Sequence, residues 1–137
     1  MRISREHVDI MICHARAEAP NEACGLLAGM ADTATSVHCL ENAQHSPSEY
    51  ALAAEGYRLL MDLDDAGQLL GAFHSHVHGP AYPSPTDRRM AAWPIHNVIV
   101  SLEDSAHPVV RAFRIVKHAW DDAGELGEVI EEQIEVV

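Results

Sequence analysis

Residues 71–87 read GAFHSHVHGPAYPSPTD, and this segment decides how the chain is built. The apolar residues before the histidines predict a central strand over residues 69–76. Further on, Ser84 followed by Pro85 is typical of a helix start, with serine at the N-cap and proline at the first helical position. The segment therefore predicts a strand, a proline-stiffened loop and a helix in direct succession.

Three polar side chains in this segment have the spacing of a metal site. Side chains two positions apart on a strand point to the same face, so His74 and His76 present two imidazoles to one point while Ser75 faces away. A catalytic zinc ion usually has three protein ligands and a water molecule. Asp87 lies in the first turn of the predicted helix, which holds its carboxylate over the strand end. We therefore predict one catalytic zinc ion (Zn2+) bound by His74, His76 and Asp87.

Simpler interpretations of each residue remain open. A His-x-His pair is commonly just two polar residues on a strand, and helix capping with dipole compensation explains Ser84 and Asp87. The combination of these residues favours the metal site. They form the long fixed pattern H-S-H-x7-S-x2-D, which chance rarely supplies. His78 continues the alternate series but lies past the expected strand end, so we interpret it as a surface or supporting residue.

A hydrolytic zinc site also needs a group that takes and returns a proton, and a carboxylate buried near the metal is the usual choice. Glu22 is the candidate, because it stands immediately before an apolar strand, where an acid is costly without a partner or a function. From the residues alone, an exposed loop position for Glu22 remains the simpler interpretation.

The rest of the chain alternates helices and strands without strict βαβ order. Helices are expected over residues 4–19 and 52–65, and further strands over residues 23–30, 36–40, 97–102 and 109–116. A turn is expected around residues 31–33. The fold class is therefore α/β in the broad sense (α+β), with a mixed sheet against which helices pack.

Length and composition limit the classes of function. The 137 residues predict one domain over residues 1–137. The formal net charge of −12 argues against a nucleic-acid partner. No apolar run approaches the roughly 20 residues that span a bilayer, so we expect no membrane association and a cytoplasmic protein.

The cysteines and the acidic end of the chain have ordinary interpretations. Cys13, Cys24 and Cys39 are odd in number and lie in apolar stretches, which favours reduced, buried thiols. In residues 125–137, glutamates alternate with aliphatic residues. This pattern favours the solvated face of a terminal strand or frayed helix over an acidic docking tail.

The ligand pattern, with Ser84 and with Glu22 upstream in the stretch PNEACGLLAG, resembles the JAMM (MPN-plus) zinc metalloprotease family. The resemblance covers nearly the whole chain. It implies that His74, His76 and Asp87 bind zinc, that Glu22 is the general acid and base acting through the zinc-bound water, and that Ser84 helps to hold the oxyanion. It also implies a mixed, curved β-sheet flanked by helices, related to the cytidine deaminase fold. Deaminase activity itself is not expected, because the P-C-x-x-C ligands are missing.

The short form of the chain and the motif NAQHSPSEY at residues 42–50 are similar to bacterial members that act on sulphur-carrier proteins of ubiquitin-like fold. This resemblance implies a peptidase that hydrolyses the amide bond after the carrier's C-terminal glycine and releases cysteine. We expect the extended Gly-Gly tail to bind beside a sheet edge.

Two other functions stay open: a general ubiquitin-like isopeptidase of the same mechanism, and a non-catalytic MPN-type binding module. A homodimer also stays open, as do the roles of His78, Cys24, Trp93 and the acidic residues 125–137.

Overall fold

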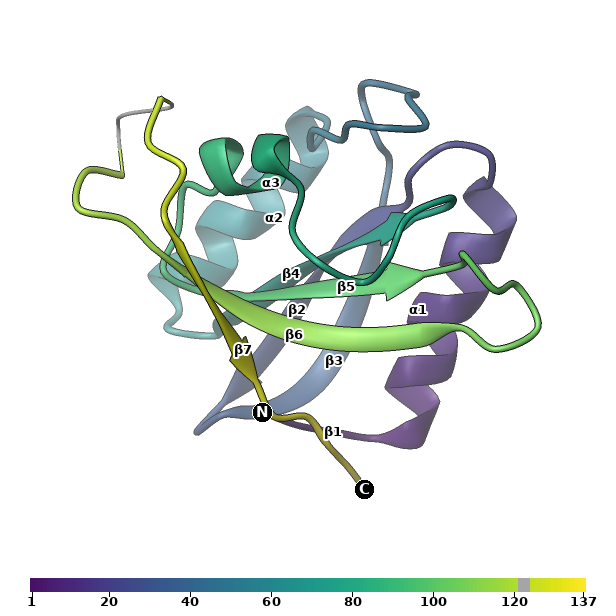
Figure 1. Cartoon of the computed structure of the whole chain (residues 1–137). Coiled ribbons are helices and arrows are strands. Elements are labelled where there is room, and N and C mark those ends of the chain that lie inside the picture. The colour runs from purple at the N-terminus through teal and green to yellow at the C-terminus, as the bar shows by residue number, and fades with distance from the viewer. Residues whose placement is uncertain (121–123) are drawn as a thin grey trace.

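The computed structural model describes residues 1–120 and 124–137. Within them, the strands form one eight-stranded sheet in the order β7-β6-β5-β4-β2-β3-β1-β8 (Figure 1). The strand bounds are β1 (Arg2–Ile3), β2 (Cys24–Met30), β3 (Thr33–Leu40), β4 (Leu69–His76), β5 (His96–Ser101), β6 (Val109–Val116), β7 (Glu128–Glu132) and β8 (Glu135–Val136). The strand that carries the histidines, β4, lies inside the sheet between β2 and β5.

The sheet is mixed and strongly curved. β4 runs parallel to β5 and antiparallel to β2. β7 and β8 stand at opposite ends of the strand order, yet only residues 133–134 separate them in the chain, so the sheet must curl until its two ends meet. Figure 1 shows the N-terminal strand β1 close to β7. The mixed, curved sheet expected from the sequence is confirmed.

In the part of the chain that the structure describes, three helices cover the two faces of the sheet (Figure 1). α1 (Arg5–Glu18) lies on one face, and Ser4 caps it by accepting a 3.1 Å hydrogen bond from the backbone N–H of His7. α2 (Ala54–Asp65) and α3 (Pro85–Met90) lie on the other face. None of the helices within residues 1–120 and 124–137 has the length and apolarity needed to cross a membrane.

The strand β2 supplies the core on both faces. Leu26 and Leu27 are fully buried and point to opposite sides, as successive strand residues must. Leu27 packs in the cluster that contains Met11 of α1, and Leu26 packs in the cluster that contains Leu60 of α2. The continuous apolar run at residues 23–30 therefore forms a strand that is buried on both faces of the sheet.

Several expectations need correction. The strand expected at residues 36–40 begins at Thr33, because Ala31 and Asp32 take left-handed φ angles of 49° and 61° and turn the chain within two residues. The expectation of buried thiols is correct for Cys24 and wrong for Cys13 and Cys39, which lie on the exposed sides of α1 and β3.

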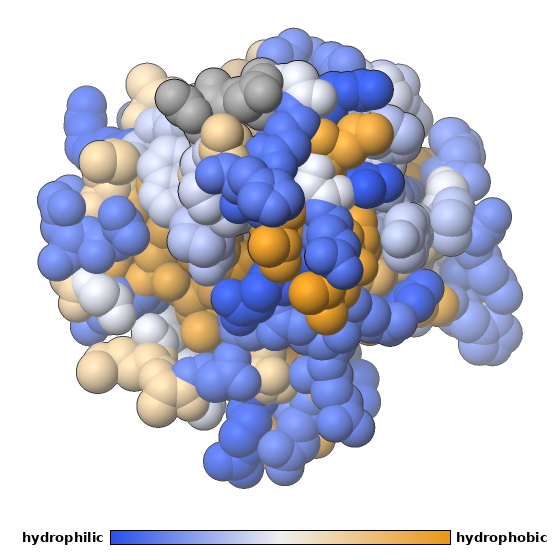
Figure 2. Space-filling view, turned by 60° about the vertical axis from the view of Figure 1, so that its left-hand side comes forward, coloured by the Kyte–Doolittle hydropathy of each residue, from blue (hydrophilic) through white to orange (hydrophobic). Residues whose placement is uncertain are grey.

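The acidic end of the chain forms strands. β7 pairs antiparallel with β6, and β8 pairs parallel with β1. Arg111 of β6 forms a forked ion pair with Glu131, with N–O distances of 2.8 and 2.7 Å. Figure 2 shows that hydrophilic residues dominate this side of the molecule, with smaller hydrophobic areas between them. The strand interpretation is confirmed, and a free acidic tail is excluded for the described residues 124–137.

We expect Gly25→Ala to lower the free energy of unfolding of the metal-free protein by at least about 2 kcal/mol, measured by urea titration. Gly25 faces the Phe73 ring across the β2–β4 pair, and a Cβ atom there would overlap both that ring and the carbonyl of His38. The matched control is Gly79→Ala, because a Cβ at Gly79 meets no atom within 4 Å. Equal unfolding midpoints for the two variants would contradict this account of the packing.

Candidate active site

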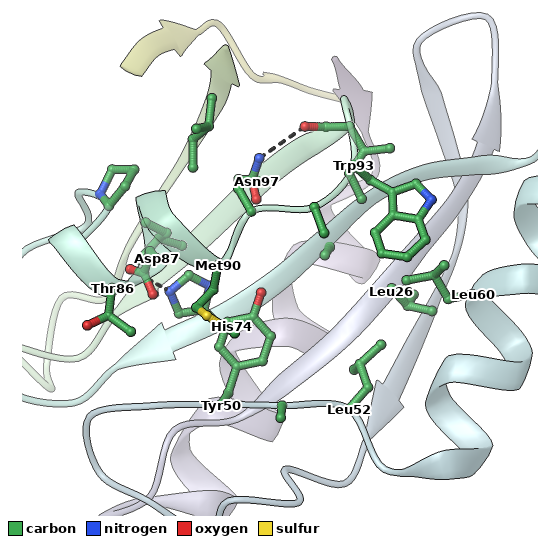
Figure 3. Close-up of a pocket in the computed structure, with 18 of the residues that line it drawn as sticks. Leu26, Tyr50, Leu52, Leu60, His74, Thr86, Asp87, Met90, Trp93 and Asn97 are labelled. Atoms are coloured by element: carbon green, nitrogen blue, oxygen red, sulfur yellow. Dashed lines mark hydrogen bonds and ion pairs between the residues drawn. The ribbon is translucent and has the colours of Figure 1, made fainter. Parts of the chain in front are cut away.

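The structure brings together the three predicted metal ligands. His74 and His76 lie at the end of β4, and Asp87 lies in the first turn of α3. Nε2 of His74 is 3.1 Å from Nε2 of His76, and the two nitrogens lie 3.1 and 3.0 Å from Oδ2 of Asp87. Figure 3 shows His74 and Asp87 facing each other from the two elements. Among the described residues, this is the one group of three or more His, Cys, Asp or Glu residues with converging ligand atoms.

The spacing of these three atoms fits a tetrahedral ion. Zinc–ligand bonds of about 2.0–2.1 Å place neighbouring ligand atoms roughly 3.3 Å apart, close to the distances observed here. Nδ1 of His76 lies 2.8 Å from the carbonyl oxygen of Pro80. With an ion bound, a proton on Nδ1 donated to that carbonyl would leave the Nε2 lone pair free to face the ion. The donor set of two imidazoles and one carboxylate is therefore one that zinc accepts.

The helix start fixes the carboxylate of Asp87. Ser84 Oγ accepts a 3.1 Å hydrogen bond from the N–H of Asp87, and Asp87 Oδ2 accepts a 2.9 Å bond from the N–H of Ser84, which together form a capping box. Burial opposes ionisation of Asp87, but His74 and the bonds donated by His74, His76 and the Ser84 N–H hold its pKa well below the usual range. The carboxylate is thus ionised and oriented.

The hydroxyl group of Ser84 can also donate a hydrogen bond. Its oxygen accepts from the N–H of Asp87, which leaves the hydroxyl proton available to an oxygen outside the helix. The capping interpretation of Ser84 is therefore confirmed, and it is compatible with the predicted contact to an oxyanion.

Glu22 is buried, with 3% of its surface exposed, so the exposed-loop interpretation is wrong. Its N–H donates to the carbonyl of Ser46 at 2.9 Å, and its carbonyl accepts from Nδ2 of Asn42 at 3.0 Å. Its Oε2 has no hydrogen-bond partner among the described residues. Burial raises the pKa of Glu22 to about 7, while the nearby His74 lowers it and Asp87 raises it. A carboxyl group with this pKa and a free oxygen can exchange protons near neutral pH.

This burial predicts that Glu22→Gln stabilises the zinc-free protein. The pKa of about 7 in the fold lies above the ordinary 4.5, so the folded state favours the protonated acid and loses stability as pH rises between these values. Glutamine stays neutral at every pH. We expect a gain in unfolding free energy of roughly 2–3 kcal/mol at pH 8 and under about 1 kcal/mol at pH 5, measured by urea titration. A gain that does not depend on pH would contradict the assigned cause.

Residues around the ligands have supporting positions. Ser75 is fully buried and its Oγ accepts a 2.8 Å hydrogen bond from the N–H of Ala23, which ties β4 to the residue after Glu22. Cys24 is buried, and burial raises its thiol pKa to about 12, which fits an inert core thiol. His78 is exposed and is not part of the ligand cluster.

Tyr50, which was not predicted as a site residue, contacts a predicted ligand directly. Its ring stacks on the imidazole of His74, with centroids 4.6 Å apart and an angle of 21° between the planes. The loop motif at residues 42–50 ends at this tyrosine, but only the fold brings it onto β4. Figure 3 shows Tyr50 beside His74 at the mouth of a pocket.

A pocket of about 130 Å³ extends from His74 and Asp87 between α2, α3 and the segment before β5. Its walls are mainly apolar and include Ile95. Figure 3 labels five more apolar wall residues: Leu26, Leu52, Leu60, Met90 and Trp93. Trp93, whose role the sequence left open, is therefore a pocket residue. An apolar pocket that opens at a candidate metal centre is suited to part of a peptide chain.

The curved mixed sheet, the ligand cluster at the end of its central strand and the buried acid define a peptidase of the JAMM type. Residues 4–116 match the family described as prokaryotic homologues of the JAB domain. The chain belongs to this family.

Curated relatives and solved structures agree with this membership. The chain is 36% identical to the CysO-cysteine peptidase of Mycobacterium tuberculosis, over 98% of this chain and 90% of that protein. It is 33% identical to the desampylase of Haloferax volcanii, over 90% of this chain and 91% of that protein. The solution structure of a Desulfitobacterium hafniense protein superimposes with a TM-score of 0.80 at 34% identity, covering 99% of this chain and 92% of that one. A JAB1/MPN domain protein of Archaeoglobus fulgidus shares the fold with a TM-score of 0.60 at 21% identity, covering 100% and 99%.

Proposed function

We propose that this protein is a zinc-dependent peptidase that hydrolyses the amide bond after the C-terminal glycine of a ubiquitin-like sulphur-carrier protein and releases cysteine. The observation that carries the proposal is the convergence of His74, His76 and Asp87 beside the buried Glu22. The similarity to a CysO-cysteine peptidase over almost the whole chain supports the carrier and the leaving group.

The residues of the site have complementary roles in this reaction. Bound zinc would supply a Lewis acid that acidifies water and polarises a carbonyl group. Glu22 accepts the proton of the attacking water and later donates it to the amine that leaves. The Ser84 hydroxyl donates to the carbonyl oxygen of the substrate as negative charge develops there. The stacked Tyr50 ring holds the His74 imidazole in place.

The expected position of the carrier tail beside a sheet edge needs revision. β4 has a hydrogen-bonded neighbour on each side, so the ligand cluster does not lie at an open edge. The apolar pocket that includes Tyr50 and Leu52 reaches His74 and Asp87 instead. We place the extended tail in this pocket, where its terminal glycine would reach the ligand cluster.

A general ubiquitin-like isopeptidase is the second candidate, because the chain also resembles desampylases and, at 37% identity, a probable TtuB-protein conjugate cleaving protease of Thermus thermophilus. The test offers the zinc-loaded protein a carrier–cysteine adduct and a lysine-linked carrier conjugate, and measures free cysteine and free protein. Release of cysteine supports the proposal. Cleavage of the lysine-linked conjugate alone supports the isopeptidase, and zinc binding without any cleavage supports a binding module.

We extend the proposal to one domain over residues 1–137. The cytoplasmic location stays a prediction of the sequence, and the homodimer stays open.

A further inference from the structure

The helix α3 carries Asp87 and follows its N-cap Ser84, yet none of its six residues is fully buried: three are half-buried and three are exposed. A helix this short has little stability of its own. The capping box orients Asp87 relative to the helix start but does not attach the helix to the rest of the molecule. Besides the bonds of Asp87 to His74 and His76, contacts on other residues of the helix must therefore hold α3 against the ends of the strands.

Arg88, the residue after Asp87, makes such a contact. Its Nε donates to the carbonyl oxygens of Leu126 and Gly127 at 3.2 Å each, and its Nη2 donates to the carbonyl of Gly127 at 2.6 Å. Arg88 forms no ion pair among the described residues. Its guanidinium is thus used as a rigid fork for two backbone carbonyls before β7, a geometry that lysine cannot reproduce.

The carbonyl that receives this fork is itself fixed. Gly127 has a left-handed φ of 65°, and a Cβ there would lie 2.8 Å from Cγ2 of Ile115 and 3.0 Å from Cγ of Lys117. The backbone at Gly127 therefore packs tightly against the end of β6. Lys117 is also buried and donates to the carbonyl of Arg89, which gives α3 a second attachment to the same strand end.

We propose that Arg88 is a positioning residue for the metal centre: by clamping α3 to Gly127, it holds the Asp87 carboxylate at the distance from His74 and His76 that one ion requires. The inference rests on the zinc centre of the proposed function. Under this proposal, the affinity for zinc also depends on the segment before β7, which is far from the ligands in the sequence. Removal of groups that orient a ligand typically weakens metal binding by about 10- to 100-fold.

The test measures the dissociation constant of zinc by competition with a chromogenic chelator, in the full chain and without substrate. Arg88→Met keeps the aliphatic stem and removes the fork. We expect it to bind zinc at least about tenfold more weakly than the parent. The matched control is Arg89→Met, because Arg89 is exposed and its side chain forms no bond among the described residues. It should stay within about twofold of the parent.

Gly127→Ala disturbs the same clamp from its other side and should also weaken zinc binding. Because the two residues act through one contact, the double variant should lose no more affinity than the weaker-binding single variant. Circular dichroism of each zinc-free variant verifies the fold. If Arg88→Met fails to fold, Arg88→Gln takes its place in the measurement.

Each outcome has a distinct meaning. A folded Arg88→Met variant that binds zinc as tightly as the parent, or losses that add in the double variant, would overturn the clamp and leave the proposed function intact. A parent protein that binds no zinc would overturn the proposed function itself.

Discussion

Glu22→Gln should lower kcat for the cleaved carrier adduct by about a thousandfold while the protein keeps about one equivalent of zinc. Glutamine has nearly the shape of glutamic acid, so the buried position and the backbone bonds to Ser46 and Asn42 are preserved. What is lost is the carboxylate oxygen that has no partner among the described residues and that can accept a proton. The measurement is a single-turnover assay of cysteine release together with elemental analysis for zinc.

The control for this variant is Glu55→Gln, because Glu55 lies in the exposed first turn of α2 and lines no part of the pocket. Its kcat should stay within about twofold of the parent. The same Glu22→Gln protein is expected to be more stable than the parent at pH 8. A loss of activity together with a gain in stability separates a catalytic role from simple damage to the fold. If Glu22→Gln retains parental kcat, the proton-transfer role assigned to Glu22 is wrong.

His74→Ala should abolish zinc binding and activity together, with less than about a tenth of an equivalent of zinc retained at neutral pH. The substitution removes one of three ligand atoms and also the ring on which Tyr50 stacks. It leaves the Asp87 carboxylate without one of its two imidazole partners, which costs about 1–3 kcal/mol of stability. Zinc content, cysteine release and urea unfolding are measured on the same preparation.

His78→Ala is the matched control for the histidine prediction. His78 lies two positions beyond His76, is exposed, and does not belong to the ligand cluster. We expect zinc content and kcat to remain at the parental level. Zinc retained at one equivalent in His74→Ala, or lost in His78→Ala, would show that the ion binds elsewhere.

The contrast between Glu22→Gln and His74→Ala tests whether proton transfer and metal binding depend on different residues of the site. The first variant is expected to keep the metal and lose proton transfer, whereas the second loses the metal and therefore both. A non-catalytic binding module would show the zinc results without any cleavage by the parent. Cleavage by the parent therefore separates the proposed function from its non-catalytic alternative.

The convergence of His74, His76 and Asp87 could be predicted because it is encoded locally. His74 and His76 share a face through the alternation of strand side chains, and the capping box of Ser84 and Asp87 depends on four consecutive residues. Glu22 was harder to predict, since an acid in a loop before a strand is more often exposed than buried. Its assignment needed the family resemblance, and the structure then placed it in the interior.

Other features escaped prediction because they depend on contacts between distant segments. The strands β1 and β8 are two residues long, which is too short for a periodic pattern. They are defined only by their pairing with each other and by the pairing of β1 with β3. Tyr50 is an ordinary loop residue until the fold lays it on His74. In the sequence, Arg88 is simply one of two adjacent arginines, Arg88 and Arg89. Its hydrogen-bond partners lie 38 and 39 positions away in the chain.

The sequence by itself determined which atoms can bind a metal and the class of fold that presents them, because alternation on a strand and capping of a helix act over a few residues. Only the tertiary structure decided how acidic Glu22 is, which ring stacks on His74, where an apolar pocket meets the ligand cluster and which contacts α3 makes. These properties arise from burial and from long-range packing, which change the pKa of a carboxyl group and the position of a helix without leaving a periodic pattern in the chain.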